Sequence, residues 1–272
     1  MLFRSHGCGG TFYFAYSSVI KHSFVQCLDS RRSSVAVLEM DLNTEQVVRT
    51  WNITGKPYGS PDGRFILVLH LSVNRTANVL LDSKVHVLFI SGGSSTPVLK
   101  STLDISFGVS RLVFGKKFGQ EGGYPVLKPT LHIPSVVSEQ VYDKVGQGDS
   151  YVAYISLLYS DKIAVLDLDQ LAPGGAAAVS YIEGVGSVFT APGMHAVSRP
   201  LALSGRWLVS PANANNSVVI IDTSTRKIHG MVMGVIGGQG LIATPAAAAQ
   251  GTYRFKETLV IALMSALFKS II

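Results

Sequence analysis

The chain has 272 residues, of which 47% are hydrophobic and 15% are charged, and its net charge is +6. This composition excludes an intrinsically disordered chain and is sufficient for one or two domains with a buried core. The positive charges are dispersed, and the densest groups are Arg31-Arg32 and Lys116-Lys117. The sequence therefore favours an ordinary solvated surface over a nucleic-acid-binding site.

The two cysteines, Cys8 and Cys27, both lie near the N-terminus. Two thiols are too few for a disulfide-dense scaffold and cannot form a zinc site alone. The sequence is equally compatible with one disulfide between them and with two free thiols. Because the first repeated unit is already present at residue 35, we expect residues 1–30 to be an irregular N-terminal segment.

An apolar stretch followed by a turn occurs twice, as VAVLEMDLNTEQVV from residue 35 and as SVVIIDTSTRKIHG from residue 217. When Asp41 is aligned with Asp222, Thr44 falls on Thr225. The aspartate side chain can accept hydrogen bonds from backbone N–H groups of a turn, and β-branched residues suit the flanking strands. The pattern predicts a β-hairpin with aspartate at the start of its turn.

A second recurring element is a turn that leads into an apolar run, as in PDGRFILV from residue 61 and SGRWLVS from residue 204. Pro and Gly favour the turn, and each turn is followed by Gly-Arg-aromatic. This element predicts that a buried strand precedes the hairpin strand. Phe65 and Trp207 occupy the same position in it, so core packing is favoured for both.

Weaker copies of the hairpin place Ser91 and Asp167 at turn positions, between Asp41 and Asp222. The successive turn positions are 50, 76 and 55 residues apart, whereas propeller blades are about 40–50 residues long. The middle step therefore requires an insertion, which we place near 120–147. We predict an all-β fold, a partial or small β-propeller of about four antiparallel blades over residues 31–272.

Propellers typically contain about 4–8 blades. Since the first unit is present at residue 35 and the chain ends in an apolar segment, we expect the blades to belong to a larger ring, of which this chain is a fragment or isoform. A small complete propeller and a β-sandwich are the alternatives. The apolar run 259–268 is too short to cross a bilayer, so no membrane span is expected.

The segments SVVIIDTSTRKIHG, VAVLEMDLNTEQVV and SPDGRF resemble blades of the YVTN-type β-propeller family. The resemblance covers about residues 35–70 and 200–232, and the family includes extracellular binding modules, lactonase-like hydrolases and haem-carrying reductases. The arrangement also resembles the C-terminal propeller region of the follistatin-related secreted glycoproteins. The Kazal module and the calcium-binding loop of those proteins are not visible in this sequence, so these functions do not carry over.

Three N-glycosylation acceptor triplets occur, at Asn52, Asn74 and Asn215. All three fall in stretches expected to be surface loops between strands, where a glycan must lie. We therefore expect a secreted or lumenal protein. The alternative is that these are plain polar loops of a cytosolic protein.

The residues that could carry chemistry form no recognised catalytic or cofactor motif. The seven histidines have no metal-ligand spacing, and the absence of Cys-x-x-Cys-His argues against haem, so no cofactor is expected. In a radial array of blades, the turn acids Asp41, Asp167 and Asp222 would lie on one face. We favour the interpretation that each caps its own turn over the alternative that they bind a metal together.

These observations predict a non-enzymatic extracellular scaffold that binds a protein partner. The alternative is a metal-dependent lactonase-like hydrolase on the same fold. Aromatic and arginine side chains often anchor protein partners. The candidates of this kind are Trp51, Tyr58, Arg64, Arg206 and Trp207.

Overall fold

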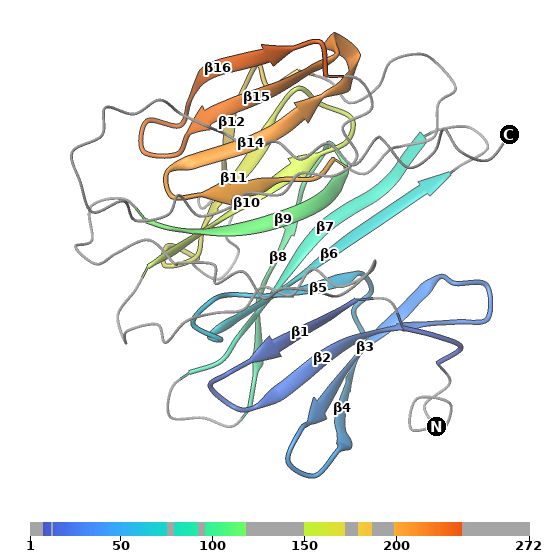
Figure 1. Ribbon diagram of the computed structural model, residues 1–272. Helices are drawn as coiled ribbons and strands as arrows, with labels where there is room; N and C mark the ends of the chain where they lie inside the picture. The colour runs from blue at the N-terminus through green and yellow to red at the C-terminus, as the bar shows by residue number, and fades with distance from the viewer. Residues whose placement is uncertain are drawn as a thin grey trace, which may run out of the picture.

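The computed structural model describes residues 8–11, 13–74, 79–91, 96–117, 150–171, 179–186 and 199–235. Within these residues, four sheets of four antiparallel strands follow one another along the chain (Figure 1). In each sheet the hydrogen-bonded neighbours are consecutive strands, so every sheet is an up-and-down meander. No helix among the described residues is both long and apolar enough to cross a membrane.

The strands are grouped into four blades. Blade 1 consists of β1 (Phe14–Ser17), β2 (His22–Leu28), β3 (Ser34–Asp41) and β4 (Gln46–Trp51). Blade 2 consists of β5 (Lys56–Gly59), β6 (Phe65–Asn74), β7 (Val79–Phe89) and β8 (Val98–Asp104). Blade 3 consists of β9 (Val109–Lys116), β10 (Tyr151–Leu157), β11 (Ile163–Asp167) and β12 (Val179–Ile182). Blade 4 consists of β13 (Ala202–Ser204), β14 (Trp207–Ala212), β15 (Ser217–Asp222) and β16 (Lys227–Met233), with the 3-10 turn η3 (Asn213–Asn215) before β15.

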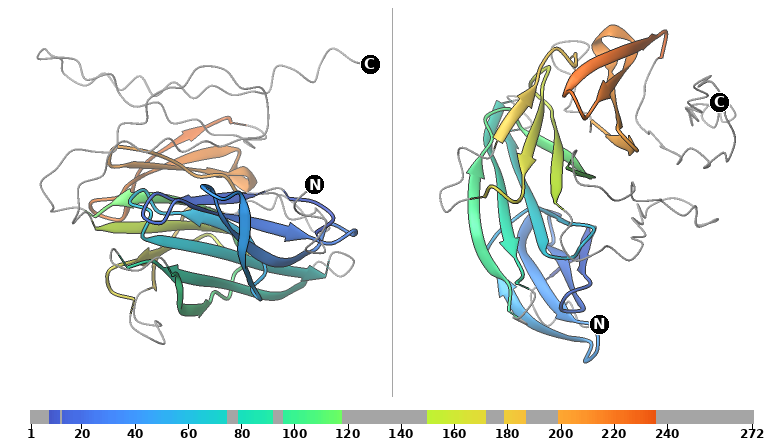
Figure 2. Two further views of the ribbon diagram at one scale, coloured as in Figure 1. Left: turned by 90° about the horizontal axis from the view of Figure 1, so that it is seen from below. Right: turned by 90° about the vertical axis from the view of Figure 1, so that its left-hand side faces the viewer.

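The four blades are arranged around an arc, with blade 1 at one end and blade 4 at the other (Figure 2). The first strands of blades 1 and 2 contact each other, as do those of blades 3 and 4, and β9 of blade 3 packs against β6 of blade 2. Four-stranded antiparallel sheets that succeed one another around an axis with their first strands innermost define a β-propeller. The predicted fold class is confirmed.

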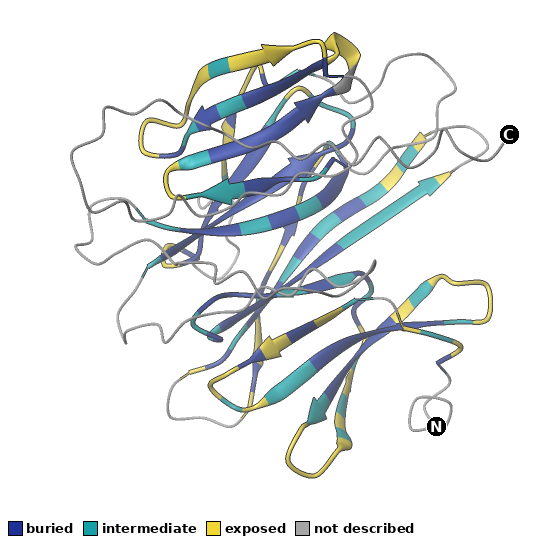
Figure 3. Cartoon of the chain, viewed as in Figure 1, coloured by how far each residue is buried: buried dark blue, intermediate teal, exposed yellow. Residues whose placement is uncertain are grey.

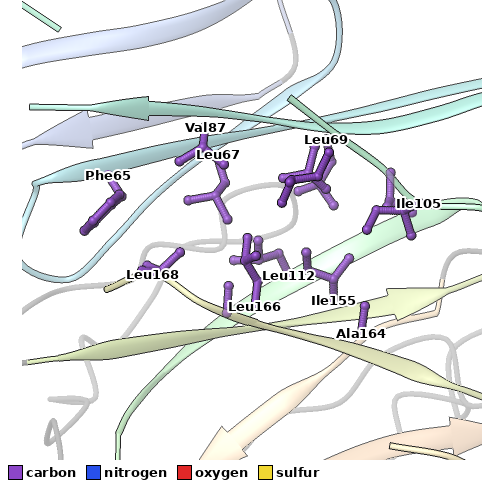
Figure 4. Close-up of a cluster of buried hydrophobic side chains, with 14 of the residues drawn as sticks. Phe65, Leu67, Leu69, Val87, Ile105, Leu112, Ile155, Ala164, Leu166 and Leu168 are labelled. Carbon is purple, nitrogen blue, oxygen red and sulfur yellow. The ribbon is translucent and has the colours of Figure 1, made fainter. Parts of the chain in front are cut away.

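Buried side chains between consecutive blades hold the arc together. Figure 3 shows that the buried residues lie mainly along the strands. The largest cluster joins blades 2 and 3, where alternate residues of β6, including Leu67 and Leu69, face Leu112 and Ile155 across the joint (Figure 4). Period-two alternation of this kind places every second residue of a strand on one face. A second cluster joins blades 1 and 2, and a third joins blades 3 and 4.

The N-terminal segment differs from its prediction. The segment 1–30, expected to be irregular, contains both β1 and β2, the first two strands of blade 1. The reason is that the recognisable aspartate turn follows the third strand of a blade, so two strands must precede it. The insertion expected near 120–147 lies outside the described residues.

Because consecutive strands run in opposite directions, each blade presents its connections alternately at two opposite edges. The hairpin-turn face carries the connections between the first and second strands and between the third and fourth strands. Its described residues are 18–21, 42–45, 60–64, 90–91, 96–97, 117, 150, 168–171, 205–206 and 223–226. The linker face carries the other connections. Its described residues are 29–33, 52–55, 105–108, 158–162, 183–186, 199–201 and 213–216.

Backbone hydrogen bonds between connections support this division. On the hairpin-turn face, Leu42 N donates to Lys21 O (3.2 Å) and Thr223 N donates to Arg206 O (2.8 Å). The Ser17 hydroxyl donates to Gly63 O (2.7 Å), which places the corresponding edges of blades 1 and 2 side by side. In Figure 1 the β15–β16 turn is on the left and the β14–β15 turn is on the right, at opposite edges of blade 4.

Candidate functional site

The hairpin-turn acids of blades 1 and 4 each cap their own turn. Asp41 Oδ1 accepts a hydrogen bond from Asn43 N (2.7 Å), and this bond lowers the pKa of Asp41. Asp222 Oδ1 accepts from both the hydroxyl (2.5 Å) and the backbone N–H (2.9 Å) of Ser224, and these bonds lower the pKa of Asp222. An aspartate that accepts hydrogen bonds two residues along the chain forms an Asx turn.

The third acid, Asp167, occupies the equivalent position in blade 3. Its Oδ1 accepts from Asp169 N (3.2 Å), and its Oδ2 pairs with Lys117 Nζ (2.7 Å) at the end of β9. Within the described ranges, no three His, Cys, Asp or Glu side chains are close enough together to hold a metal ion. The geometry therefore gives these three carboxylates a role in their own turns.

The SPDG turn between β5 and β6 is held by side chains at its ends. Ser60 Oγ donates to Asp62 Oδ1 (2.5 Å) and accepts from Phe65 N (2.9 Å), while Arg64 pairs with Asp62. Gly63 has a φ of +72°, and a Cβ atom there would lie 2.6 Å from Ser18 N. Glycine is therefore required both by the backbone conformation and by the close approach of blade 1.

Arg206, Trp207 and His229 form a stack at the hairpin-turn edge of blade 4, in which Arg206 and His229 are exposed and Trp207 is half-buried. The Arg206 guanidinium carbon lies 4.4 Å from the Trp207 ring centroid, and the rings of Trp207 and His229 are 4.5 Å apart. Trp207 pairs with Asp222 in the same register as Phe65 pairs with Phe89, as the sequence predicts. Phe65 is buried, but Trp207 is only half-buried, so core packing describes the first and not the second.

The other predicted anchors are partly buried and are engaged in contacts within the chain. Trp51, at the end of β4, packs against the cluster between blades 1 and 2, and its indole N–H donates to Glu39 Oε2 (3.0 Å). Tyr58, on the inner strand β5, packs against the cluster between blades 2 and 3. Arg64 is occupied by its ion pair with Asp62. The structure therefore brings only Arg206 and Trp207 of the five together, on the hairpin-turn face.

All three glycosylation acceptors lie on the linker face or at the strand end that borders it. Asn52 is exposed in the linker between blades 1 and 2, and Asn74 is the exposed last residue of β6. Asn215 is exposed in η3, between β14 and β15. Since the described hairpin-turn face carries none of these acceptors, the two faces are chemically distinct.

Cys8 and Cys27 form a disulfide with a Cα–Cα distance of 5.3 Å. Together with Ala36, Leu38 and Val47, the bridge forms an apolar cluster within blade 1. The disulfide ties the start of the described chain to β2. Of the two arrangements compatible with the sequence, the structure contains the bridge.

Sequence reasoning missed a buried carboxylate that joins three strands of blade 1. Glu39 is 2% exposed, and its Oε1 lies 2.7 Å from His22 Nδ1. Its Oε2 accepts from the Trp51 indole and lies 3.9 Å from Arg49 Nε. Arg49 in turn donates to Pro97 O of blade 2 (3.2 Å). The available signal was a charged residue inside the apolar run VAVLEMD, since a carboxylate in a buried strand needs partners.

Sequence reasoning also missed Arg199, which is 0% exposed. Its guanidinium donates to Ser210 Oγ (2.9 Å), Ser160 O (3.2 Å), Val185 O (3.2 Å) and Gly186 O (2.8 Å). Burial lowers the pKa of Arg199 to about 10. No local pattern marks this residue, because its partners come from separate connections that meet only in the folded propeller.

No protein-family model matches the sequence, and a comparison with curated proteins finds no match. Among solved structures, the chain is similar to apo AztD from Citrobacter koseri, with a TM-score of 0.47 and 11% identity over 85% of this chain and 48% of that one. It is similar to the Cps50 (Swd1) β-propeller domain of Myceliophteria thermophila, with a TM-score of 0.42 and 13% identity over 87% and 56%. It is also similar to hydrazine synthase of Kuenenia stuttgartiensis, with a TM-score of 0.41 and 15% identity over 85% and 65%. The chain spans about half to two thirds of the length of these structures.

Proposed function

We propose that this chain is a non-enzymatic extracellular propeller scaffold that binds a protein partner on its hairpin-turn face. The observation that carries the proposal is the separation of the two faces. Asn52, Asn74 and Asn215 are on or beside the linker face, whereas the stack of exposed Arg206 on half-buried Trp207 is on the hairpin-turn face. Glycans on the first face would leave the second face open to a partner.

The chemistry of the hairpin-turn face suits protein recognition. Tryptophan and arginine are enriched among the residues that dominate binding energy at protein interfaces. In blade 4 they are stacked on each other, and Arg206 also lies 3.9 Å from the Asp222 carboxylate. A stack that is already ordered loses less conformational entropy when a partner covers it.

Two further features support the extracellular part of the proposal. The Cys8–Cys27 disulfide is of a kind that persists in oxidising compartments. The resemblance of the repeated segments to YVTN-type blades and to the propeller region of follistatin-related secreted glycoproteins points the same way, and it rests on the sequence alone. The hydrolase alternative has less support, because Asp41, Asp167 and Asp222 are each engaged in their own turn.

A new glycan on the hairpin-turn face tests the proposal. The substitution Glu45→Ser turns Asn43-Thr44-Glu45 into a glycosylation acceptor on the exposed β3–β4 turn. Proteins cross-linked to the secreted wild-type chain would be identified by mass spectrometry. We expect glycosylated Glu45→Ser to lose the captured partner.

The matched control carries Asn43→Gln together with Glu45→Ser, so the turn is altered in the same place but bears no glycan. This control should capture the partner as the wild-type chain does. Asp222→Asn offers a second position, since it makes Asn-Thr-Ser at the equivalent turn of blade 4. Capture that survives glycans at both turns would contradict binding at this face.

A further inference from the structure

The first strands of three blades bring two cations and two phenols together at the centre of the arc. Tyr13 directly precedes β1, Lys56 begins β5, and Arg111 lies near the start of β9. Tyr58 lies two residues after Lys56, on the same side of β5. We call these four residues the central cluster. They are far apart in the sequence and meet only because the first strands are innermost.

One aromatic ring lies next to both cations. The Tyr13 ring centroid is 5.0 Å from Lys56 Nζ and 5.4 Å from the Arg111 guanidinium carbon. Cations at these distances from an aromatic face are attracted by the ring quadrupole. This attraction is weaker than that of a carboxylate, and it places both cations beside the same ring.

A hydrogen-bond donor is also left over in the central cluster. The Tyr58 hydroxyl is buried, and its proton has no acceptor among the described residues. Burial raises the pKa of Tyr58 to about 12, so the phenol keeps its proton at neutral pH. The Arg111 guanidinium acts on the phenol through its charge and as a hydrogen-bond donor to the phenol oxygen. A buried O–H group without an acceptor costs free energy, which a ligand atom that accepts its proton would recover.

The electrostatics of Lys56 indicate surplus positive charge. Burial, and after it the charge of Arg111, lower the pKa of Lys56 from 10.5 to about 8. No carboxylate among the described residues contributes to this shift. At neutral pH Lys56 is therefore still largely protonated, beside another cation and in a partly desolvated position.

We propose that the central cluster is a binding site for the oxyanion group of a small ligand, a carboxylate or a phosphate. The Lys56 ammonium and the Arg111 guanidinium supply two charge-assisted contacts, and the Tyr58 hydroxyl supplies a third hydrogen bond. Tyr13, Lys56 and Arg111 are only partly buried, so the group is open to solvent on one side. The site lies at the linker end of the inner strands, away from the proposed protein-binding face, and does not depend on it.

Isothermal titration calorimetry of the full chain with inorganic phosphate and, separately, with acetate tests the proposal. The reference titration uses chloride at the same ionic strength. We expect at least one of the two oxyanions to bind. Binding of acetate alone would identify a carboxylate ligand, and binding of phosphate alone would identify a phosphate ligand.

The variants Lys56→Met and Tyr58→Phe assign the binding to the central cluster. Loss of one hydrogen bond to a charged group should weaken binding about tenfold or more. Lys162→Met removes a cation of the linker face that is paired with Glu183 (2.6 Å), and it should leave the affinity unchanged. If Lys56→Met fails to fold, Tyr58→Phe, which removes a single oxygen atom, decides the result.

Two results would overturn the proposal. One is that neither phosphate nor acetate binds the wild-type chain above the chloride reference. The other is that folded Tyr58→Phe and Lys56→Met bind the anion as tightly as the wild-type chain does.

Discussion

The Arg199 guanidinium donates a hydrogen bond to the Ser210 hydroxyl across the joint between blades 3 and 4, at 2.9 Å. The same guanidinium donates to three carbonyl oxygens, one in the β10–β11 turn and two in the linker that precedes blade 4. One fully buried side chain therefore satisfies polar groups from both blades. A planar fork with five N–H donors suits this arrangement, and lysine cannot reproduce it.

We predict that Arg199→Met lowers the free energy of unfolding by about 3 kcal/mol or more, because several buried acceptors lose their donors at once. Urea denaturation followed by circular dichroism measures the change. Arg226→Met is the matched control, since Arg226 is exposed and makes one hydrogen bond to Ser180 (3.0 Å). Equal stability of the two variants would show that Arg199 does not hold the joint.

The second prediction concerns the buried carboxylate of Glu39 in blade 1. Glu39→Gln should destabilise the chain by about 1–3 kcal/mol, because the amide cannot accept from both His22 and Trp51 as the carboxylate does. Glu45→Gln, at an exposed turn position, should change stability very little. Thermal denaturation of the two variants side by side measures the difference, and an unchanged melting temperature for Glu39→Gln would count against the network.

The third prediction is a pH dependence caused by Lys56. Its pKa is about 8 in the folded chain and 10.5 in the unfolded chain, so the unfolded state binds more protons between these values. Stability contributed by this group therefore rises with pH across this window and is lowest below pH 8. The full pKa shift of Lys56 corresponds to a change of about 3 kcal/mol in the free energy of unfolding.

The comparison of the wild-type chain with Lys56→Met isolates this effect from all other titrations. Arg111 is the charged group that acts on Lys56. The measurements should stop at about pH 9.5, because tyrosine side chains of the unfolded chain ionise above it. We expect the wild-type chain to gain stability relative to Lys56→Met as the pH rises above 8. A constant difference between the two proteins would contradict the lowered pKa.

The fourth prediction concerns the disulfide. Cys8 and Cys27 are 19 residues apart, and closing a loop of this length restricts the unfolded chain by about 3 kcal/mol. The double substitution Cys8→Ser and Cys27→Ser should lower the melting temperature. Treatment of the wild-type chain with a reducing agent should have a similar effect. If reduction leaves the wild-type melting temperature unchanged, the bridge does not form.

The sequence predicts those parts of the fold that repeat locally. Asp41, Asp167 and Asp222 stand at the ends of the third strands of their blades, as their alignment predicts, because an Asx turn is specified within a few residues. The shared register of Phe65 and Trp207 was also predictable, because the turn and the Gly-Arg-aromatic pattern that set it are likewise local in the sequence. Strands β1 and β2 carry no such turn motif, so they were not recognised.

The features that join blades could not be predicted from the sequence. Arg199 donates to groups up to 89 residues away in the chain, and Tyr13, Lys56 and Arg111 come from three different blades. Their proximity depends on the angle and order of the blades, which no short segment encodes. The division of the connections into two faces likewise appears only when the strands are counted from the true start of blade 1.

The most direct test of the proposed function is glycosidase digestion of the chain expressed in mammalian cells with and without an added signal sequence. We predict that the chain is recovered from the medium and that its gel mobility increases after digestion. This shift should be absent when Asn52, Asn74 and Asn215 are all replaced by Gln. A folded chain that stays inside the cell without glycans in both cases would contradict an extracellular scaffold.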